Sequence, residues 1–288
     1  MWAGDLSRDA KGDPARKRAW HPHPADRAGP AGGTGLVAVT LGSLFDGIGG
    51  FPLAAVRNGI TPLWASEIEA FPIEVTKLRF PQMLHVGDIT KLDGAKLPPV
   101  DIICGGSPCQ DLSVAGQRRG LAGERSGLFM EQVRIVKEMR NEDIRRGRTA
   151  QFIRPRFLLW GNVPGAFSSG TPKGEDFRIV LEEIIRIKNS SCSVPRPNTG
   201  AWGPAGAAIL GDEFSLAWRC MDAQFWGVAQ RRKRIFLVAD FGGLAAPQIL
   251  FIPESLHGYP AQGAGTRQGA AGEAGTGVNA AIGPHPTP

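Results

Sequence analysis

The sequence lacks the residue patterns of a metalloprotein, a disulfide-stabilised domain or a membrane protein. Its four cysteines form no Cys-x-x-Cys pair and do not cluster with histidine, so neither a zinc site nor a disulfide framework is expected. No apolar run reaches the roughly 18–20 residues that a membrane-spanning helix needs. The charged N-terminus has no apolar segment of the kind found in secretory signals. We therefore expect a cytoplasmic protein that binds no metal and no membrane.

The sequence does have an ordinary apolar content and an excess of positive charge. Hydrophobic residues make up 42% of the 288 positions, which is enough for a buried core. The formal net charge is +6. This charge is compatible with a polyanionic partner such as DNA, but it does not specify one.

Composition divides the chain into three parts. Residues 1–35 are rich in Pro, Gly, Ala, Arg and Asp without a sustained apolar period, which predicts a disordered extension. Residues 245–288 decay into a Gly/Ala-rich tail. The structured part is therefore predicted to be a single domain over residues 36–244, and we find no internal repeat.

Within this part, short apolar runs alternate with segments of helical periodicity. Strands are predicted at residues 36–41, 62–66, 84–86, 100–104, 156–160 and 235–239. Helices are predicted at residues 51–58, 69–79, 128–139 and 177–185. Apolar strands that alternate with amphipathic helices favour a mostly parallel sheet covered on both faces, which is an α/β doubly wound fold.

The first predicted strand leads into a glycine-rich turn, Phe45-Asp46-Gly47-Ile48-Gly49-Gly50. Ligands of such sheets bind at the carboxyl ends of the strands, where glycines allow a close backbone approach. Glu67, just past the second strand, is placed to accept from ribose hydroxyls, and Asp88 from an adenine amino group. The glycine spacing departs from GxGxxG, so S-adenosylmethionine fits better than NAD. A solvated Glu67 and a helix-capping Asp88 remain alternatives.

A second loop, Gly105-Gly106-Ser107-Pro108-Cys109-Gln110, directly follows the predicted strand at 100–104. A cysteine held in a rigid loop at a strand's carboxyl end is a candidate nucleophile. Cations that could favour its thiolate follow in the same stretch: Arg118, Arg119 and Arg125. The alternative for a lone cysteine is a small buried hydrophobic residue. That alternative fits Cys104, whereas the loop context favours a nucleophile at Cys109.

Four segments, in order along the chain, resemble motifs of the DNA cytosine-5 methyltransferase family. They are similar to its cofactor loop, its Pro-Cys catalytic loop, the segment after that loop and its Gln-x-Arg-x-Arg motif: Ser43-Leu44-Phe45-Asp46-Gly47-Ile48-Gly49-Gly50, Gly106-Ser107-Pro108-Cys109-Gln110, Arg125-Ser126-Gly127-Leu128-Phe129 and Gln230-Arg231-Arg232-Lys233-Arg234. One such match would be weak, but four in order are specific. The resemblance covers about residues 38–243 and implies the Rossmann-like fold of S-adenosylmethionine-dependent methyltransferases.

The resemblance implies methyl transfer from S-adenosylmethionine to C5 of a cytosine flipped out of double-stranded DNA. The thiolate of Cys109 would attack C6 and make C5 nucleophilic. Matching positions imply these cofactor-binding residues: Phe45, Asp46, Gly47, Gly49, Gly50, Glu67, Ile68, Asp88, Ile89, Pro108 and Leu128. Asn162 and Arg232 are expected to assist catalysis. The residues expected at DNA are Gln110, Arg118, Gln230, Arg232 and Arg234; a solvated charge run is the alternative for the arginines.

The sequence also departs from the family pattern. Gly161, in Trp160-Gly161-Asn162-Val163, occupies the place of the glutamate of the family's Glu-Asn-Val motif. That glutamate donates to N3 of cytosine during thiolate attack, and one such general acid is worth about 10²–10⁴-fold in rate. Ala229 stands where the family commonly has proline. Nothing after residue 244 resembles a target-recognition domain or the family's last Asn-containing motif, so specific base readout is expected to be absent.

Three functions remain open from the sequence. The first is a monomeric DNA methyltransferase of this family with little or no activity. The second is a non-catalytic S-adenosylmethionine- or DNA-binding remnant of a prophage or restriction-modification system. The third is an NAD-dependent oxidoreductase, against which the spacing of the glycines argues.

Overall fold

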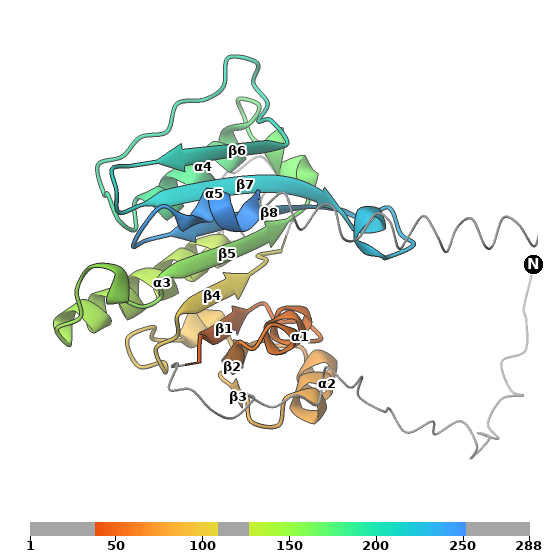
Figure 1. The fold of residues 1–288 in the computed structure, drawn as a ribbon. Coiled ribbons are helices and arrows are strands. Elements are labelled where there is room, and N and C mark those ends of the chain that lie inside the picture. The colour runs from red at the N-terminus through yellow and green to blue at the C-terminus, as the bar shows by residue number, and fades with distance from the viewer. Residues whose placement is uncertain (1–37, 109–126, 252–288) are drawn as a thin grey trace, which may run out of the picture.

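The computed structural model describes residues 38–108 and 127–251. Within them, one sheet has the strand order β3-β2-β1-β4-β5-β8-β7-β6 (Figure 1). The strands are β1 (Thr40–Leu44), β2 (Thr61–Ser66), β3 (Leu84–His85), β4 (Ile102–Gly105), β5 (Phe157–Asn162), β6 (Ala205–Ile209), β7 (Ser215–Asp222) and β8 (Lys233–Asp240). The helices are α1 (Gly50–Arg57), α2 (Ala70–Arg79), α3 (Gly127–Arg145), α4 (Glu175–Ile185) and α5 (Ala245–Leu250).

The sheet has a parallel part and an antiparallel part. Strand β1 pairs in parallel with both β2 and β4, and the parallel part continues to β3 on one side and to β5 on the other. Strands β8, β7 and β6 add antiparallel pairs beyond β5. From β1 the chain first adds β2 and β3 on one side, and it then adds β4 and β5 on the other side. This confirms the predicted doubly wound α/β fold.

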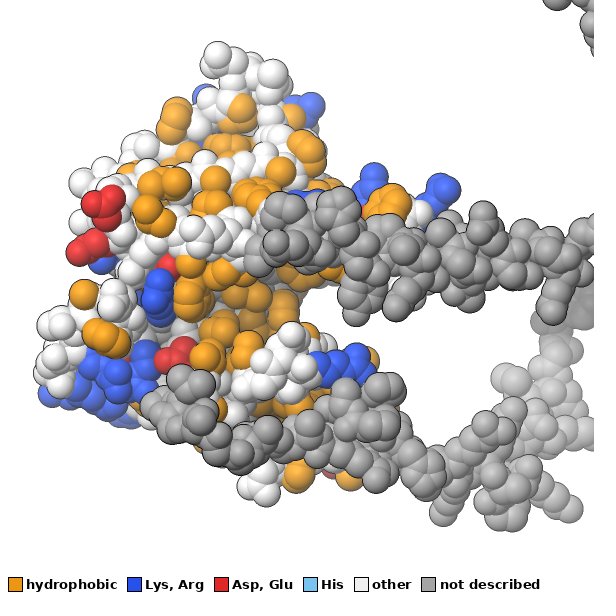
Figure 2. All heavy atoms as spheres, in the orientation of Figure 1, with side chains coloured by type: hydrophobic (Ala, Val, Ile, Leu, Met, Phe, Trp, Pro, Cys, Tyr) orange, Lys and Arg blue, Asp and Glu red, His pale blue; other side chains and the backbone are white. Residues whose placement is uncertain are grey.

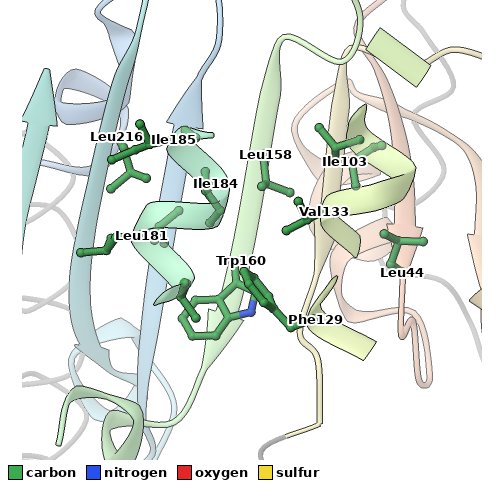
Figure 3. Packing of buried hydrophobic residues seen from close by; sticks show 14 of the residues in the cluster. Leu44, Ile103, Phe129, Val133, Leu158, Trp160, Leu181, Ile184, Ile185 and Leu216 are labelled. Carbon is green, nitrogen blue, oxygen red and sulfur yellow. The ribbon is translucent and has the colours of Figure 1, made fainter. Parts of the chain in front are cut away.

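Helices α3 and α4 cover one face of the sheet and bury the largest hydrophobic cluster (Figure 3). Along α3, Phe129, Val133 and Val136 recur at the spacing of one helical face and are all buried. The side chain of Trp160 from β5 lies fully buried at the centre. Its ring is 6.2 Å from that of Phe129, in an edge-to-face arrangement that aromatic pairs prefer.

The opposite face is covered by α1 and α5. Ala55 of α1 packs with Leu41 and Cys104, so Cys104 is a buried hydrophobic residue, as its position in the predicted strand indicated. Ala246 and Leu250 of α5 are buried against β7 and β8. The predicted domain end at residue 244 is therefore wrong, because α5 belongs to the packed fold.

The predicted first strand at residues 36–41 is also displaced, since β1 spans Thr40–Leu44. Two long-range contacts fix its position. Asp101, just before β4, accepts hydrogen bonds from the backbone N–H and the hydroxyl of Thr40 at 2.8 and 2.7 Å. The ring of Trp64 lies so close to Gly42 that a Cβ there would come within 2.2 Å of it. Neither contact can be read from local hydrophobicity.

An ion pair with a buried carboxylate joins the end of β8 to the segment before β5. Asp240 at the end of β8 is fully buried and accepts two hydrogen bonds from the guanidinium of Arg156, at 2.8 and 2.9 Å. It also accepts from the backbone N–H groups of Gly242 and Ala245. These bonds hold the start of α5 against the segment that leads into β5. No helix of the described segments is both long and apolar enough to cross a bilayer.

Candidate active site

Strands β1, β2, β4 and β5 are parallel, so they end at one edge of the sheet and the loops that follow them meet there. Figure 2 shows the described molecule hollowed on the side toward which β4 and β5 run in Figure 1. Hydrophobic side chains lie at the bottom of this hollow, and Lys and Arg side chains lie above and below its opening. We call this hollow the crevice.

The loop after β1 carries five of the eleven predicted cofactor residues. Phe45 has a positive φ of 53°, which is rare for a residue with a side chain and typical of functional loops. Gly47 and Gly49 also have positive φ, of 57° and 83°. A Cβ on Gly47 or Gly50 would meet no atom within 4 Å. The backbone at Gly47 and Gly50 therefore faces open space, as a ligand-binding loop requires, whereas Gly49 packs against Phe80 and Thr76.

The carboxylate of Glu67 connects this loop to the end of β2. Its Oε2 accepts from the N–H of Gly47 at 2.7 Å, and its Oε1 accepts from the N–H groups of Ile68 and Glu69 at 2.8 and 3.0 Å. Oε2, which accepts one bond, keeps a lone pair for a further donor. The side chain of Ile68 is 69% exposed beside it. A fixed acceptor next to an exposed apolar side chain suits an adenosine, whose ribose hydroxyls donate and whose base is flat and apolar.

The two predicted cofactor residues after β3, Asp88 and Ile89, differ in exposure. Asp88 is part-exposed and caps the short 3-10 helix η3 (Ile89–Lys91), accepting from the N–H and hydroxyl of Thr90 at 3.0 and 2.8 Å. These bonds hold the pKa of Asp88 below its ordinary value. The capping alternative is thus what the free protein shows. The side chain of Ile89 is buried and belongs to the main hydrophobic cluster.

Together these residues fit S-adenosylmethionine better than a dinucleotide. The loops at residues 45–50 and 66–69 contain carboxylates and no Lys or Arg to balance a pyrophosphate. The open space in front of Gly47 and Gly50 leaves room for the cofactor. Leu128, at the start of α3, is half-buried against the main cluster.

Asp46 is the most perturbed carboxyl of the described loops. It is 6% exposed; its Oδ1 accepts from the hydroxyl of Ser43 at 2.5 Å, whereas its Oδ2 is buried without a partner. Burial raises the pKa of Asp46 to about 6; the bond from Ser43 opposes this rise, and the charge of Glu67 adds to it. The free protein therefore holds a carboxyl behind the cofactor loop that ionises near neutral pH.

This shift predicts a pH-dependent stability. Because the folded state holds the proton of Asp46 more tightly than the unfolded state does, the free energy of unfolding falls as pH rises from about 4 to 6. Asp46→Asn has no carboxyl to ionise, so its free energy of unfolding should not fall in this range. It should exceed that of the parent by up to about 3 kcal/mol at pH 7.5 and be nearly equal to it at pH 4. Urea unfolding of both proteins at the two pH values measures this. An equal difference at both values would show that Asp46 does not titrate in this range.

The start of the predicted catalytic loop is anchored by β5. Ser107 is 2% exposed; its hydroxyl accepts from Nε1 of Trp160 at 3.4 Å, and its carbonyl oxygen accepts from Nδ2 of Asn162 at 3.3 Å. Pro108 is exposed. Asn162 therefore holds the residue two positions before Cys109, in line with its predicted orienting role. Other predicted residues lie outside the described segments: Cys109, Gln110, Arg118, Arg119 and Arg125.

Gly161 lies in β5 next to these anchors, on the face that carries α1. A Cβ built on it would meet Cζ of Phe51 at 3.6 Å, Cε1 of Phe236 at 3.9 Å and the carbonyl oxygen of Ile235 at 4.0 Å. These are ordinary van der Waals distances. Gly161 has no positive φ, since it is a regular strand residue paired with Phe236. The backbone therefore does not require glycine at this position.

The predicted DNA-contacting residues lie at the end of the connection between β7 and β8 and at the start of β8. Gln230 and Arg232 are exposed, and Arg234 is half-buried with Nη1 donating to the carbonyl of Lys233. Asp222, at the end of β7, accepts from the backbone N–H of Arg232 at 3.0 Å. This bond fixes the backbone of the basic segment and leaves the Arg232 side chain exposed, as an anion-binding residue needs.

Sequence reasoning missed the supporting residues Ser107 and Asp222. Each residue bonds to a segment that is distant in the sequence, and such contacts leave no local pattern. The one available clue was position, because Ser107 adjoins the Pro-Cys pair and Asp222 precedes the basic run. No group of three or more His, Cys, Asp or Glu side chains in the described ranges could hold a metal ion.

Comparison with known proteins defines the class. The model of the C-5 cytosine-specific DNA methylase family matches residues 39–189. The type II methyltransferase M1.ScrFI of Lactococcus lactis subsp. cremoris is 43% identical over 196 residues, which are 68% of this chain and 40% of that protein. The DNA N-6-adenine-methyltransferase of Escherichia phage P1 is 33% identical over 222 residues, 69% of this chain and 28% of that protein.

Among solved structures, the Dnmt2 methyltransferase of S. pombe aligns with 71% of this chain and 51% of its own, with a TM-score of 0.47 and 16% identity. The matched part of this chain spans between 28% and 41% of the length of the curated relatives. The family model and the identity to M1.ScrFI define the class, a family of DNA methylases. The chain belongs to the C-5 cytosine-specific DNA methylase family, whose methyl donor is S-adenosylmethionine.

Proposed function

We propose that this chain carries the catalytic core of a DNA (cytosine-5) methyltransferase, with Cys109 as the nucleophile and double-stranded DNA as the substrate. The observation that carries the proposal is the shared edge of β1, β2 and β4. That edge places the bare loop after β1, the carboxylate of Glu67 and the Pro108 end of the Cys109 loop around one crevice.

In this proposal the residues after β1 and β2 bind the cofactor, and the cysteine after β4 is the nucleophile. S-adenosylmethionine, when bound, supplies an electrophilic methyl group. Glu67 accepts from its ribose, while Phe45 and the exposed Ile68 contact its adenine. The thiolate of Cys109 would attack C6 of a flipped cytosine, so that electrons flow to C5, which takes the methyl group and leaves S-adenosylhomocysteine. Loss of the C5 proton and elimination of the thiolate from C6 then release 5-methylcytosine.

The remaining proposed residues hold the nucleophile and the DNA. Asn162 fixes the approach of the Cys109 loop through the carbonyl of Ser107. Arg232 and Arg234 offer positive charge to the base or its phosphates, and Gln110, Arg118 and Gln230 are proposed at the same DNA surface. Arginine suits this task because its planar fork matches phosphate oxygens.

The name of the phage P1 relative raises the alternative of adenine as the target. An exocyclic amine is itself the nucleophile in N6 methylation, so that reaction needs no attacking thiol. C5 of cytosine, by contrast, must first be activated by addition at C6. The sequence Ser107-Pro108-Cys109 at the end of β4 therefore supports cytosine for this chain.

We further propose that turnover is slow. Gly161 offers no side-chain proton at N3 of the cytosine, and none of its three nearest neighbours supplies one: Phe51, Phe236 and the carbonyl of Ile235. General acid catalysis by one side chain is worth about 10²–10⁴-fold, so its loss alone would reduce methyl transfer by that factor. Gly161 also supports the second candidate, a non-catalytic protein that binds S-adenosylmethionine and DNA.

Two measurements test the proposed function. Calorimetry with S-adenosylhomocysteine should show binding that Glu67→Gln weakens about tenfold, because a carboxylate accepts hydroxyl donors roughly twice as strongly as an amide. Transfer of tritiated methyl groups to mixed-sequence DNA should lie near background. Binding without any transfer would favour the non-catalytic candidate, turnover at ordinary enzyme rates would refute slow catalysis, and absence of binding would refute both.

A further inference from the structure

Gln132 lies at an unexpected place in α3. Its neighbours along the helix, Phe129, Val133 and Val136, face the hydrophobic core, and Figure 3 shows Phe129 and Val133 directed at the sheet. Gln132 itself is 0% exposed. Both of its amide atoms, Nε2 and Oε1, are buried without a hydrogen-bond partner.

The amide lies over the last rung of the parallel strands. A Cβ built on Gly105 would be 3.0 Å from Nε2 and 3.1 Å from Oε1 of Gln132. Gly105 is the last residue of β4, and it pairs with Leu44 at the end of β1 and with Trp160 of β5. The absence of a side chain at Gly105 therefore makes the space that the amide occupies, at the carboxyl end of β4.

An orphaned amide at this position is costly to the free protein. The large majority of buried polar side-chain atoms have a partner, and one left without any loses its water without compensation. An apolar residue of the same size would suit the helix face better. A helix position that keeps such a group next to a ligand crevice is explained if the ligand supplies the missing partners.

We propose that Gln132 binds the amino-acid end of S-adenosylmethionine. This rests on the proposed function, which assigns the adenosine to Glu67 after β2. In the sheet, β1 lies between β2 and β4, and Gln132 lies beside Gly105 at the end of β4. If the adenosine is bound after β2, the amino-acid end of an extended cofactor reaches toward β4. That end carries a carboxylate acceptor and an ammonium donor, and an amide offers one group to match each. Leu128, one helical turn before Gln132, is already expected beside the cofactor.

Two ligands separate this role from a merely structural one. S-adenosylhomocysteine contains the amino-acid end, whereas 5′-methylthioadenosine lacks it and keeps the adenosine. In Gln132→Met, which has nearly the same volume, affinity for S-adenosylhomocysteine should fall about 10- to 100-fold while affinity for methylthioadenosine stays within about twofold. The melting temperature of the free protein should rise, because an unsatisfied amide has been removed.

Matched variants complete the experiment, which is done by calorimetry on the full chain. Met139→Leu changes another buried residue of α3, two turns farther along, and should leave both affinities unchanged. Gln132→Asn keeps an amide but withdraws it by one methylene, so it should show the same selective loss as Gln132→Met. Equal affinities of the parent and both Gln132 variants for S-adenosylhomocysteine would overturn the inference, as would equal losses for the two ligands. If the parent binds neither ligand, the proposed function fails with it.

Discussion

The Gly161→Glu variant is expected to form a covalent adduct with 5-fluorocytosine DNA about 10²–10⁴ times faster than the parent chain. Such DNA traps the enzyme because fluorine at C5 cannot leave as a proton does. The variant should fold, because the position is a regular strand residue with no positive φ. A Cβ there meets its nearest neighbour, Cζ of Phe51, at 3.6 Å.

Two controls separate chemistry from packing in this experiment. Gly161→Gln has the size of glutamate but no acidic proton, and Gly161→Ala adds only the Cβ. Both should trap DNA at the rate of the parent. Adduct measured by gel shift in the presence of S-adenosylmethionine gives the rate. Equal trapping by the Glu and Gln variants would show that the missing acid does not limit the reaction.

The Asp240→Ala variant is expected to lose about 3 kcal/mol of folding free energy, measured by urea unfolding at pH 7. The removal leaves the guanidinium of Arg156 without its bidentate partner and two backbone N–H groups, of Gly242 and Ala245, without an acceptor. Arg156 is about one-third exposed, which places the loss at the lower end of the range for buried pairs. As a control, Glu74→Ala breaks the exposed pair with Lys77 and should cost less than about 0.5 kcal/mol.

The carboxylate of Asp240 also makes the free energy of unfolding fall at acidic pH. Burial alone would raise the pKa of Asp240, but the bonds from Arg156, Gly242 and Ala245 outweigh it and hold the pKa below its ordinary value. The stabilisation is therefore complete above pH 4 and is lost as pH falls through the lowered pKa. Asp240→Asn should lack this acid-limb loss. An acid limb that is unchanged in Asp240→Asn would assign it to other carboxylates.

Apart from β1, the strands of the parallel half of the sheet were predicted well because they are short apolar runs bounded by turn residues. Helices α1 and α2 and strand β2 lie within one or two residues of their predicted bounds. The hairpin of β6 and β7 was not predicted. Strand β6 is made of Ala and Gly with one Ile, a composition with little strand preference, and it is held by pairing with β7.

The proposed cofactor loops were predicted from their resemblance to a family. The hydrogen bonds that hold these loops could not be predicted from the sequence. Glu67 is fixed by an N–H twenty residues earlier in the chain, at Gly47. The buried Oδ2 of Asp46 depends on the packing of several segments. Gln132 gave the one sequence signal that went unused, a polar residue among the apolar positions of α3. Local patterns report which residues face inward, whereas partners depend on which distant strands become neighbours.

Strand β5 carries both Gly161 and the two side chains, Trp160 and Asn162, that hold Ser107. The support of the proposed catalytic loop and the position that lacks the acid are thus on one strand. Some glycine codons differ from glutamate codons by a single base. A gene that encodes Gly161 as GGA or GGG therefore lies one point mutation away from glutamate, at a position that accommodates a Cβ at ordinary contact distances.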